Sequence, residues 1–484
     1  MNVVEPILFQ AKFQPEAPAL CAQGRGVVSY AKLAAQMNSV ARRAQAEGLK
    51  RGDIAALSID DQMLHSAVIL GLTQAGIIPV SVAMQKTPAG LKIDAVIANT
   101  NYPFGTEARH LTADATWISG DQAPLPTEPN GRAAGDEICR IVLTSGTTGG
   151  PKAVALTHNF VLGSSSRYEQ MLGGRFAGYS RLYMNIGLGS APGYRFLIYI
   201  LGRGGTAFFH GESVEHTLRA FEIFQIQAIR SSPAMLAQLL ARCDQFPSID
   251  VHVETIIAGG SLLPQALFER AAPRLCSHLL TLYGATETNF VATAPVRRIA
   301  HIPGAAGYVT PGARIEIVDE NDDPLPVGTE GIVRLRSEFG VDRYIDDPVE
   351  SAKVFRDGWF YPGDLGSLTA DNLLIISGRA HDILNVGGAK LAAERLEAIL
   401  TSFQGITEVA AFVATSPRGV DEVWAAIVCR EKVDPESVRA YCRGKIASQF
   451  VPAQVVKFDA LPITATGKVD RQQLKQTLMA TARS

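Results

Sequence analysis

Hydrophobic and polar residues alternate along the first half of the chain at two different spacings. Residues 30–46 place apolar side chains at helical spacing, whereas residues 54–58 and 77–80 are short apolar runs. Helices that alternate with short apolar strands are typical of a parallel sheet covered on both faces. The pattern therefore predicts an α/β fold with parallel-type sheets covered by helices.

The same alternation resumes further along the chain and then gives way to another pattern. Between Phe208 and Ile257 we expect a helix around 217–224, a strand at 228–230 and a helix over 233–243. After Pro295 short strands separated by turns take over, at 314–318 and 331–335, and they indicate a small β subdomain.

Beyond Gly378 the pattern predicts a separate, smaller α+β unit. Its expected elements are a helix over 392–402, strands at 409–414 and 423–429, and a helix over 435–448. With 484 residues and 47% hydrophobic content, the chain is long enough for at least two cores, which agrees with this division.

Charge and cysteine content narrow the kinds of partner. The net charge of −2 and the lack of a long like-charge run give no sign of a nucleic acid or a membrane surface, so we expect small-molecule partners. The cysteines show no spacing typical of a disulfide framework or of zinc. With no leader-like N-terminus, and with the apolar stretch 67–82 broken by Gln74 and Pro79, we expect no membrane span and a soluble, cytoplasmic protein. The cysteines are Cys21, Cys139, Cys243, Cys276, Cys429 and Cys442.

The most informative segment is a hydroxyl-rich glycine loop at 144–152 that ends in Lys152. The apolar run 141–143 feeds the loop as a strand, and the polar stretch 120–137 before it predicts an exposed loop. Main-chain N–H groups of a glycine loop can surround an anion, and threonines, a serine and a lysine add donors for a polyphosphate. Because Pro151 precedes the lysine, the loop is not a Walker P-loop. It predicts a binding site for the phosphates of a nucleotide triphosphate.

This loop resembles the phosphate-loop signature of the adenylate-forming superfamily, which includes acyl-CoA synthetases, peptide-synthetase adenylation domains and beetle luciferases. Four further segments that resemble signatures of that family follow in the same order, so the resemblance covers nearly the whole chain. They are 283–287, 359–366, 378–390 and 462–471.

The resemblance implies a set of ATP-binding and catalytic residues. Tyr283 would stack near adenine, Thr286 would meet the α-phosphate and Glu287 would hold Mg²⁺, as a carboxylate suits this hard cation. An ionised Asp364 would accept both ribose hydroxyls, and Lys468 would bridge the substrate carboxylate and the α-phosphate. The full ATP/AMP-binding set expected is Thr144, Ser145, Gly146, Thr147, Thr148, Lys152, Gly260, Tyr283, Asp364 and Arg379.

The resemblance also implies a large domain over 1–378, a hinge at 379–382 and a small mobile domain over 383–484. The hinge residue, commonly Asp or Lys in this family, is His381, which leaves its energetics and pH response open. Gly387 and Gly388 would let the thiol-bearing arm of coenzyme A approach closely, with Lys390 beside them.

The acid itself is not named by the sequence. The candidates for an acyl pocket are Ser190, Gly193, Tyr194, Gly259, Gly284, Ala285 and Asn289. Small residues among them, and Gly260, could leave room for a ring or a branched acyl group. An α-amino acid is disfavoured because no aspartate for its ammonium is evident near 184–194. Arg195 is either a counterion for a second carboxylate or an ordinary exposed or structural arginine.

The resemblance implies a ligase that forms an acyl-adenylate from ATP and a carboxylic acid, with Mg²⁺, and passes the acyl group to CoA. Two alternatives stay open: a stand-alone enzyme that loads the phosphopantetheine arm of a carrier protein, and a non-catalytic adenylate-binding protein. Retention of the proposed chemical residues, among them Lys152, Glu287 and Lys468, disfavours the last.

Overall fold

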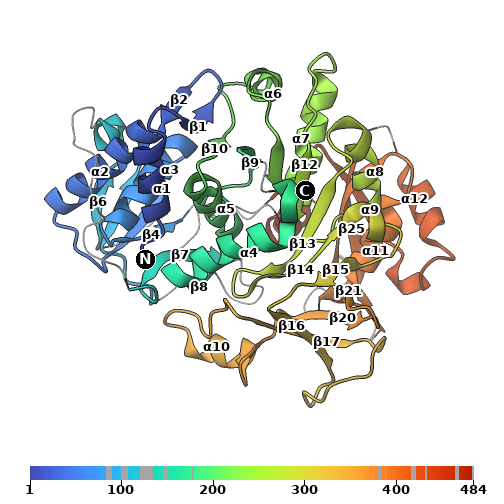
Figure 1. Cartoon of the computed structure of the whole chain (residues 1–484). Coiled ribbons are helices and arrows are strands. Elements are labelled where there is room, and N and C mark those ends of the chain that lie inside the picture. The colour runs from blue at the N-terminus through green and yellow to red at the C-terminus, as the bar shows by residue number, and fades with distance from the viewer. Residues whose placement is uncertain are drawn as a thin grey trace.

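The computed structural model describes residues 1–82, 90–99, 107–119, 134–144, 151–176, 179–379, 383–386, 389–415, 421–430, 433–463 and 468–481. Figure 1 shows the first third of the chain on one side of the molecule, the long central sheet in its middle and the last hundred residues on the other side. The chain thus forms a large α/β body with a smaller C-terminal part.

The N-terminal body contains a six-stranded sheet. Its strand order is β6-β5-β3-β4-β7-β8, with parallel pairs throughout except for the antiparallel β7–β8 hairpin. The strands are β3 (Ile54–Ser58), β4 (Ile78–Ser81), β5 (Ala95–Ala98), β6 (Arg109–Thr112), β7 (Ile138–Thr144) and β8 (Lys152–Thr157).

A longer sheet runs through the centre of the molecule. From β1 to β13 its neighbours pair in parallel, and beyond β13 its pairs are antiparallel. The parallel part, with the edge strand β2, contains β1 (Pro18–Ala22), β2 (Gly26–Ser29), β9 (Arg181–Asn185), β10 (Thr206–Phe208), β11 (Ala228–Ser231), β12 (Thr255–Gly259) and β13 (Leu279–Ala285).

The antiparallel part of this sheet forms the expected β subdomain. Its strands are β14 (Asn289–Pro295), β15 (Ala305–Val309), β16 (Ala313–Val318), β17 (Gly331–Ser337), β18 (Phe355–Arg356), β19 (Trp359–Phe360), β20 (Asp364–Leu368) and β21 (Leu373–Arg379). Helices α9 (Val296–Ile299) and α10 (Pro348–Val354) lie in its connections.

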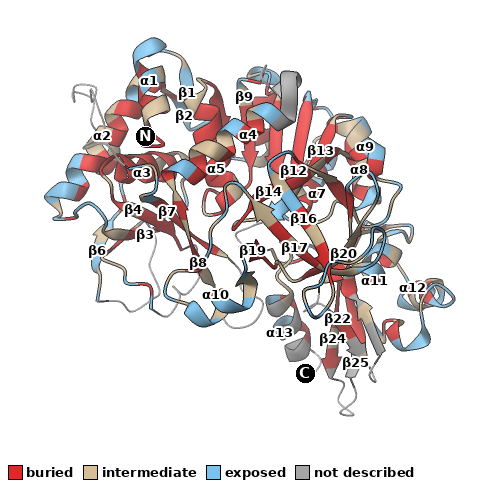
Figure 2. Ribbon diagram, turned by 60° about the horizontal axis from the view of Figure 1, so that its bottom comes forward, coloured by how far each residue is buried: buried red, intermediate tan, exposed pale blue. Residues whose placement is uncertain are grey.

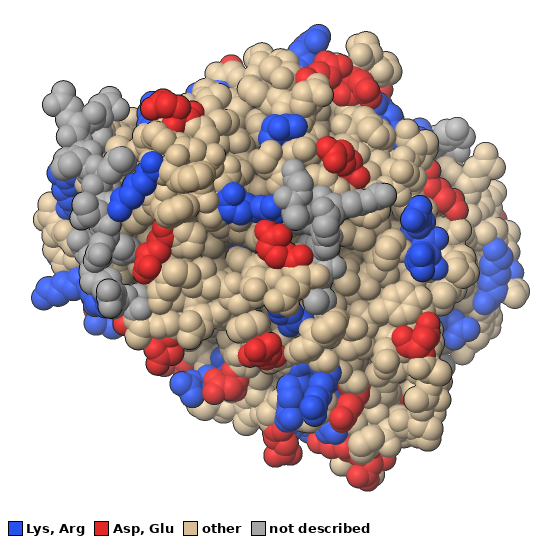
Figure 3. Space-filling model, viewed as in Figure 1, with Lys and Arg blue, Asp and Glu red and all other residues tan. Residues whose placement is uncertain are grey.

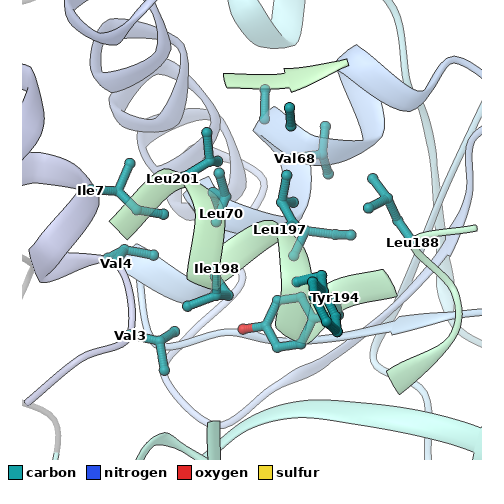
Figure 4. Packing of buried hydrophobic residues seen from close by; sticks show 14 of the residues in the cluster. Val3, Val4, Ile7, Val68, Leu70, Leu188, Tyr194, Leu197, Ile198 and Leu201 are labelled. Carbon is teal, nitrogen blue, oxygen red and sulfur yellow. The ribbon is translucent and has the colours of Figure 1, made fainter. Parts of the chain in front are cut away.

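The largest core lies between the two sheets and is filled by helices from both halves of the body. It includes Ala55 and Leu57 of the six-stranded sheet, Leu182 and Met184 of the central sheet, and the helices between them. Figure 4 shows Val3, Ile7, Leu70, Leu197 and other side chains of this cluster in contact. The helices are α1 (Glu5–Phe13), α2 (Tyr30–Ala46), α3 (Gln62–Gln74), α4 (His158–Phe176) and α5 (Ala191–Gly202).

Three amphipathic helices cover the other face of the central sheet, where a second core includes Tyr183, Ile229 and Ile256. They are α6 (Val214–Ile223), α7 (Pro233–Gln245) and α8 (Gln265–Arg274). Side-chain caps begin α6 and α7, where Ser213 and Ser232 accept hydrogen bonds from main-chain N–H groups three residues on. Figure 2 shows the strands between the helical layers as the most buried part of the molecule.

The C-terminal part has hydrophobic clusters of its own, which include Leu396, Ala425 and Val438, and Phe412, Leu461 and Leu474. A hairpin, β22 (Ile383–Val386) and β23 (Ala389–Ala392), leads into a sheet in which β24 and β25 pair antiparallel and β25 and β26 pair in parallel. The remaining elements are β24 (Ile406–Thr415), β25 (Asp421–Cys429), β26 (Gln454–Phe458), α11 (Ala393–Thr401), α12 (Pro435–Cys442) and α13 (Arg471–Thr481); two short 3₁₀ turns complete the chain, η1 (Ala115–Ile118) and η2 (Ser448–Phe450).

Charged residues join the C-terminal part to the outer helices of the large body. Arg430 forms an ion pair of 2.6 Å with Asp244 at the end of α7, and both side chains are about half exposed, at 51% and 48%. Arg270 of α8 lies close enough to Glu408 of β24 to lower the pKa of that carboxyl, although burial raises it by more.

Most of the expected elements are confirmed, including the helix over 30–46, the strands at 54–58 and 228–230, and the β subdomain. One expectation was wrong: the helix over 435–448 ends at Cys442. Gly444 follows with a φ of 86°, a left-handed conformation that ends a helix, and Ser448 starts a 3₁₀ turn. The polar loop at 120–137 lies outside the described residues except for 134–137.

The surface and the thiols agree with the composition. All six cysteines are buried as free thiols. Figure 3 shows basic and acidic side chains interspersed on the visible face. Within the described residues, no helix has the length and hydropathy needed to cross a bilayer, and no group of three or more His, Cys, Asp or Glu side chains could hold a metal ion.

Candidate active site

The glycine loop connects the two strands of the β7–β8 hairpin, where Thr144 and Lys152 lie opposite each other in register. The loop residues between them, including Ser145, Gly146, Thr147 and Thr148, lie outside the described part of the chain. Lys152 is largely buried, and its ammonium lies 3.0 Å from a carboxylate oxygen of Asp347 and 3.4 Å from one of Glu350. Both carboxylates belong to the start of α10, in a segment that no sequence motif singled out.

Asp364 joins two other predicted residues in one polar cluster. Tyr283 donates its hydroxyl to Asp364 Oδ2 at 2.5 Å, and Arg379 Nε lies 3.1 Å from Asp364 Oδ1. The last contact follows from the sheet, because Asp364 and Arg379 are register partners on β20 and β21. Burial, and next the Asp364 carboxylate, raises the pKa of Tyr283 well above its ordinary value, so its hydroxyl remains a donor.

Thr286 and Glu287 lie in the turn between β13 and β14, and Glu287 is 5% exposed. Tyr344 donates its hydroxyl to Glu287 Oε1 at 2.9 Å. Burial raises the pKa of the Glu287 carboxyl; a main-chain hydrogen bond, the Tyr344 hydroxyl and the charges of Lys468 and Arg195 oppose that rise. A cation from the C-terminal part and another from α5 therefore act on the same carboxylate.

Lys468 reaches this point from the far end of the sequence. It follows residues 464–467, which lie outside the described part of the chain, and the flanking Ile463 and Val469 pair through an isolated bridge. The charge of Lys468 lowers the pKa of Glu287, so the last signature acts electrostatically on the second. His381, Gly387 and Gly388 lie outside the described residues, and Lys390 lies on β23.

Two acyl-pocket candidates, Ser190 and Tyr194, make structural contacts within the large body. Ser190 caps α5, accepting from Gly193 N at 3.1 Å and donating to Gly187 O at 2.8 Å. Tyr194 is fully buried in the core between the sheets, where Figure 4 shows it among aliphatic side chains. Its hydroxyl faces Cys139 Sγ at 3.9 Å.

The glycines in the candidate pocket are explained by close main-chain packing more than by free space. A Cβ on Gly193 would lie 2.2 Å from Gly187 O, and one on Gly284 would lie 2.0 Å from Asn289 O. A Cβ on Gly259 would lie 2.8 Å from Leu282 O and 3.3 Å from Nη2 of Arg230. Gly260 differs, because its φ of 104° requires glycine while the space around it is open.

An aromatic wall lies next to these glycines. Tyr168 of α4 packs against Phe196 of α5 and Phe290 of β14, with ring centroids 4.3 and 5.2 Å apart, and its hydroxyl faces Oδ1 of Asn289 at 3.5 Å. Ala285 is half-buried at the end of β13 and packs against the core of the β subdomain. Asn289 itself has a φ of 61° and a buried Nδ2 without a hydrogen-bond partner among the described residues.

Four residues of this site were missed by the sequence reasoning: Tyr344, Asp347, Glu350 and Arg230. The first three come from the connection after β17 and approach the site only through tertiary structure. Arg230 carried a signal, because a charged residue inside the apolar strand 228–230 is unusual for a buried position.

Known proteins resemble this chain over nearly its whole length. The family model described as AMP-binding enzyme matches residues 9–345, and the model described as AMP-binding enzyme C-terminal domain matches residues 395–468. A 2-succinylbenzoate–CoA ligase of Bacillus licheniformis is 27% identical over 96% of this chain and 98% of its own length. The fatty acid–acyl-carrier-protein ligase ScoC of Streptomyces coeruleorubidus is 25% identical over 98% of this chain and 96% of its own.

Solved structures share the whole fold. The o-succinylbenzoate CoA synthetase of Bacillus subtilis in complex with the acyl-adenylate OSB-AMP superposes with a TM-score of 0.81, at 22% identity, and covers 97% of both chains. ATP-bound MatB of Rhodopseudomonas palustris gives a TM-score of 0.79 at 21% identity and covers both chains completely. The α/β fold with a C-terminal small domain is therefore shown for this chain.

Proposed function

The chain belongs to the family of AMP-binding enzymes, and we propose that it activates a carboxylic acid with ATP and transfers the acyl group to the thiol of coenzyme A. In the first step a substrate carboxylate oxygen attacks the α-phosphorus, and the bond to the β-phosphate breaks, so that pyrophosphate leaves. In the second step a thiol displaces AMP from the acyl-adenylate and loses its proton.

The observation that carries this proposal is that the charge of Lys468 acts on the buried Glu287 carboxyl and lowers its pKa against the effect of burial. A cation on a flexible stem whose charge reaches this carboxylate can neutralise charge that builds between two anions in the first step. The same arrangement supports the domain division proposed from the sequence, with residues 1–378 and 383–484 on either side of the hinge at 379–382.

The remaining residues would bind different parts of the nucleotide. Asp364, already bonded to Tyr283 and Arg379, has the acceptor chemistry for ribose hydroxyls, and Lys152 has the charge for the departing phosphates. The Glu287 carboxylate fits Mg²⁺, since this hard cation prefers oxygen ligands. When bound, Mg²⁺ would supply charge neutralisation on the phosphate oxygens.

A pyrophosphate-release screen tests the proposal. Aryl, short-chain, long-chain and dicarboxylic acids are each supplied with Mg-ATP, then with CoA or with a carrier protein bearing its phosphopantetheine arm. We expect acid-dependent pyrophosphate release and an acyl-CoA product. The relatives include both CoA ligases and the carrier-protein ligase ScoC. Acylation of the carrier in preference to CoA would therefore mean that the acceptor is a carrier protein and not CoA. No acid-dependent pyrophosphate release would overturn it.

A further inference from the structure

Two arginines are buried on the acyl side of the site. Arg195 on α5 is 3% exposed and Arg230 on β11 is 2% exposed. Arg195 lies over the ring of Phe160, and Arg230 lies over the ring of Phe196, part of the aromatic wall. Phe196 is the residue that follows Arg195 on α5, so α5 links the two arginines. Burial, and after it the charge of Arg195, lowers the pKa of Arg230 to about 10. Two cations thus share one apolar region.

The hydrogen-bonding capacity of these two side chains is only partly used. Within the described part of the chain, Nε and Nη1 of Arg195 and Nε of Arg230 are buried without a hydrogen-bond partner. Arg230 Nη1 donates to the carbonyl oxygens of Ser231 and Ile257, which hold the guanidinium in place. Its Nη2 lies beside Gly259, at the carboxyl end of β12. Hydrogen bonds to carbonyl oxygens position this guanidinium but do not neutralise its charge.

Arg167 shows how the same fold treats a structural arginine. It too is buried and lies over an aromatic ring, that of Phe290. Its guanidinium donates to Ser337 Oγ at 2.8 Å, Thr310 Oγ1 at 2.6 Å and Pro311 O at 3.3 Å, and only its Nε is buried without a partner among the described residues. Arg195, on the neighbouring helix, has no such set of acceptors among the described residues. The contrast indicates that Arg195 is not held only for packing.

The protein supplies little negative charge near the pair. The carboxylate whose charge reaches Arg195 is Glu287, which already accepts a hydrogen bond from Tyr344 and also interacts with Lys468. No ion pair joins Arg195 or Arg230 to a carboxylate of the described residues within 4.0 Å. Because an unpaired charge is costly to bury, the missing negative charge is best supplied by a ligand.

We propose that the acid is a dicarboxylate whose non-reacting carboxylate lies against the guanidiniums of Arg195 and Arg230. This inference rests on the proposed activation of a carboxylic acid. Glu287 and Lys468 mark the end where the reacting carboxylate meets ATP, and the charge of Arg195 interacts with Glu287 as well as with Arg230. A planar guanidinium matches a carboxylate through two parallel N–H donors, so the pair selects both charge and shape.

Discrimination against uncharged analogues follows from the same geometry. A monocarboxylate with a methyl group in place of the second carboxylate would leave buried donors unpaired, and sites built around hydrogen bonds reject such analogues strongly. We therefore expect a preference for the diacid of at least about tenfold in kcat/KM.

The experiment uses matched pairs of acids in acid-dependent ATP–pyrophosphate exchange. The pairs are succinate with butyrate, glutarate with valerate, and terephthalate with 4-methylbenzoate. The expected result is a diacid preference in at least one pair. Preference for the monoacid in every pair would overturn the inference while leaving the proposed function intact.

Variants then locate the preference. Arg195→Met and Arg230→Met should each reduce the diacid-to-monoacid ratio toward one while the KM for ATP stays unchanged. Arg203→Gln, at the end of the same helix in an ion pair with Glu169, is the matched control and should keep the ratio. If a Met variant does not fold, the Lys variant at that position keeps a point charge and should lower the ratio partly. An unchanged ratio in the folded variants at both positions would contradict the assignment.

A binding measurement separates this inference from the proposed function. If no acid supports exchange, thermal melting in Mg-AMP with and without each of the six acids still tests the subsite. Stabilisation by a diacid, lost in Arg195→Met or Arg195→Lys, would retain the subsite although the activity fails. Absence of any stabilisation by the diacids would overturn the subsite as well.

Discussion

The two ends of the site treat their charged side chains differently. At the nucleotide end Lys152 is paired with Asp347 and Glu350, and Asp364 is paired with Arg379 and Tyr283. At the acyl end Arg195 and Arg230 are more deeply buried, yet retain donors without partners in the described part of the chain.

The difference teaches how each end meets its ligand. Groups that are already paired must exchange protein contacts for ligand contacts, so the net gain on binding ATP is moderate but the geometry is fixed beforehand. Unpaired buried cations gain more from an anion, and they penalise a ligand that brings none. The first arrangement suits a cosubstrate common to a whole family, and the second suits selection of one acid.

The largest effect is expected at Lys468, which belongs to neither end but joins them. Lys468→Ala should reduce adenylate formation about 10²–10³-fold, as for loss of a group that stabilises developing charge. It should leave the conversion of a supplied acyl-adenylate to thioester close to wild type. Pyrophosphate release and thioester formation are measured separately, with Lys457→Ala on β26 as the control. Equal loss in both half-reactions would remove the role proposed for Lys468.

The free energy of unfolding should respond differently when a hydrogen-bonded buried arginine is removed and when a buried arginine without such bonds is removed. Arg167→Met removes three hydrogen bonds and should destabilise the ligand-free protein by about 2–3 kcal/mol. Arg195→Met removes a buried charge without such bonds and should be neutral or stabilising by about 1 kcal/mol. Both replacements keep an unbranched side chain over an aromatic ring. Midpoints of thermal or urea unfolding measure the difference, and equal destabilisation would show that Arg195 has structural partners after all.

At the nucleotide end, Asp364→Ala should weaken ATP binding by about 1.5–3 kcal/mol, the range for lost charge-assisted hydrogen bonds. Calorimetric titration with ATP and Mg²⁺ measures the affinity. Asp364→Asn keeps an acceptor for Tyr283, so its ATP affinity should lie between those of the wild type and Asp364→Ala. Asp371→Ala, in the exposed turn before β21, is the control. Unchanged ATP affinity in Asp364→Ala would remove this carboxylate from the nucleotide site.

The smallest expected effect tests whether Lys152 must leave its carboxylate partners in order to bind ATP. Asp347→Asn keeps the cap of α10 through Oδ1, which accepts from Glu350 N, but replaces the carboxylate oxygen that faces Lys152. Because a partly exposed ion pair contributes only about 0.2–1 kcal/mol, the KM for ATP should fall about two- to fivefold. A higher KM would mean that Asp347 positions Lys152 for ATP instead of competing with it. Asp342→Asn, in an exposed segment, is the control.

The grouping of the residues proposed for the nucleotide end could be predicted from the sequence because they lie in short segments with recognisable order. Tyr283, Asp364 and Arg379 were named from separate signatures, and the structure brings them into contact. Tyr344 and Asp347 could not be found this way, since only tertiary packing brings their connection to the site.

The acyl end was less predictable for physical reasons. Gly193 and Gly284 suggested open space, but a small residue serves equally where two main chains approach closely, and the sequence does not distinguish these cases. Arg195 was identified as a possible counterion, whereas its burial depends on the packing of α5 in the tertiary structure.

The ion pair between Arg430 and Asp244 has a consequence for the attachment of the C-terminal part. Both side chains are about half exposed, so the contact is worth only about 0.2–1 kcal/mol and is screened by salt. Raised ionic strength should therefore weaken this contact between the C-terminal part and α7, while the buried clusters on either side of it are unaffected.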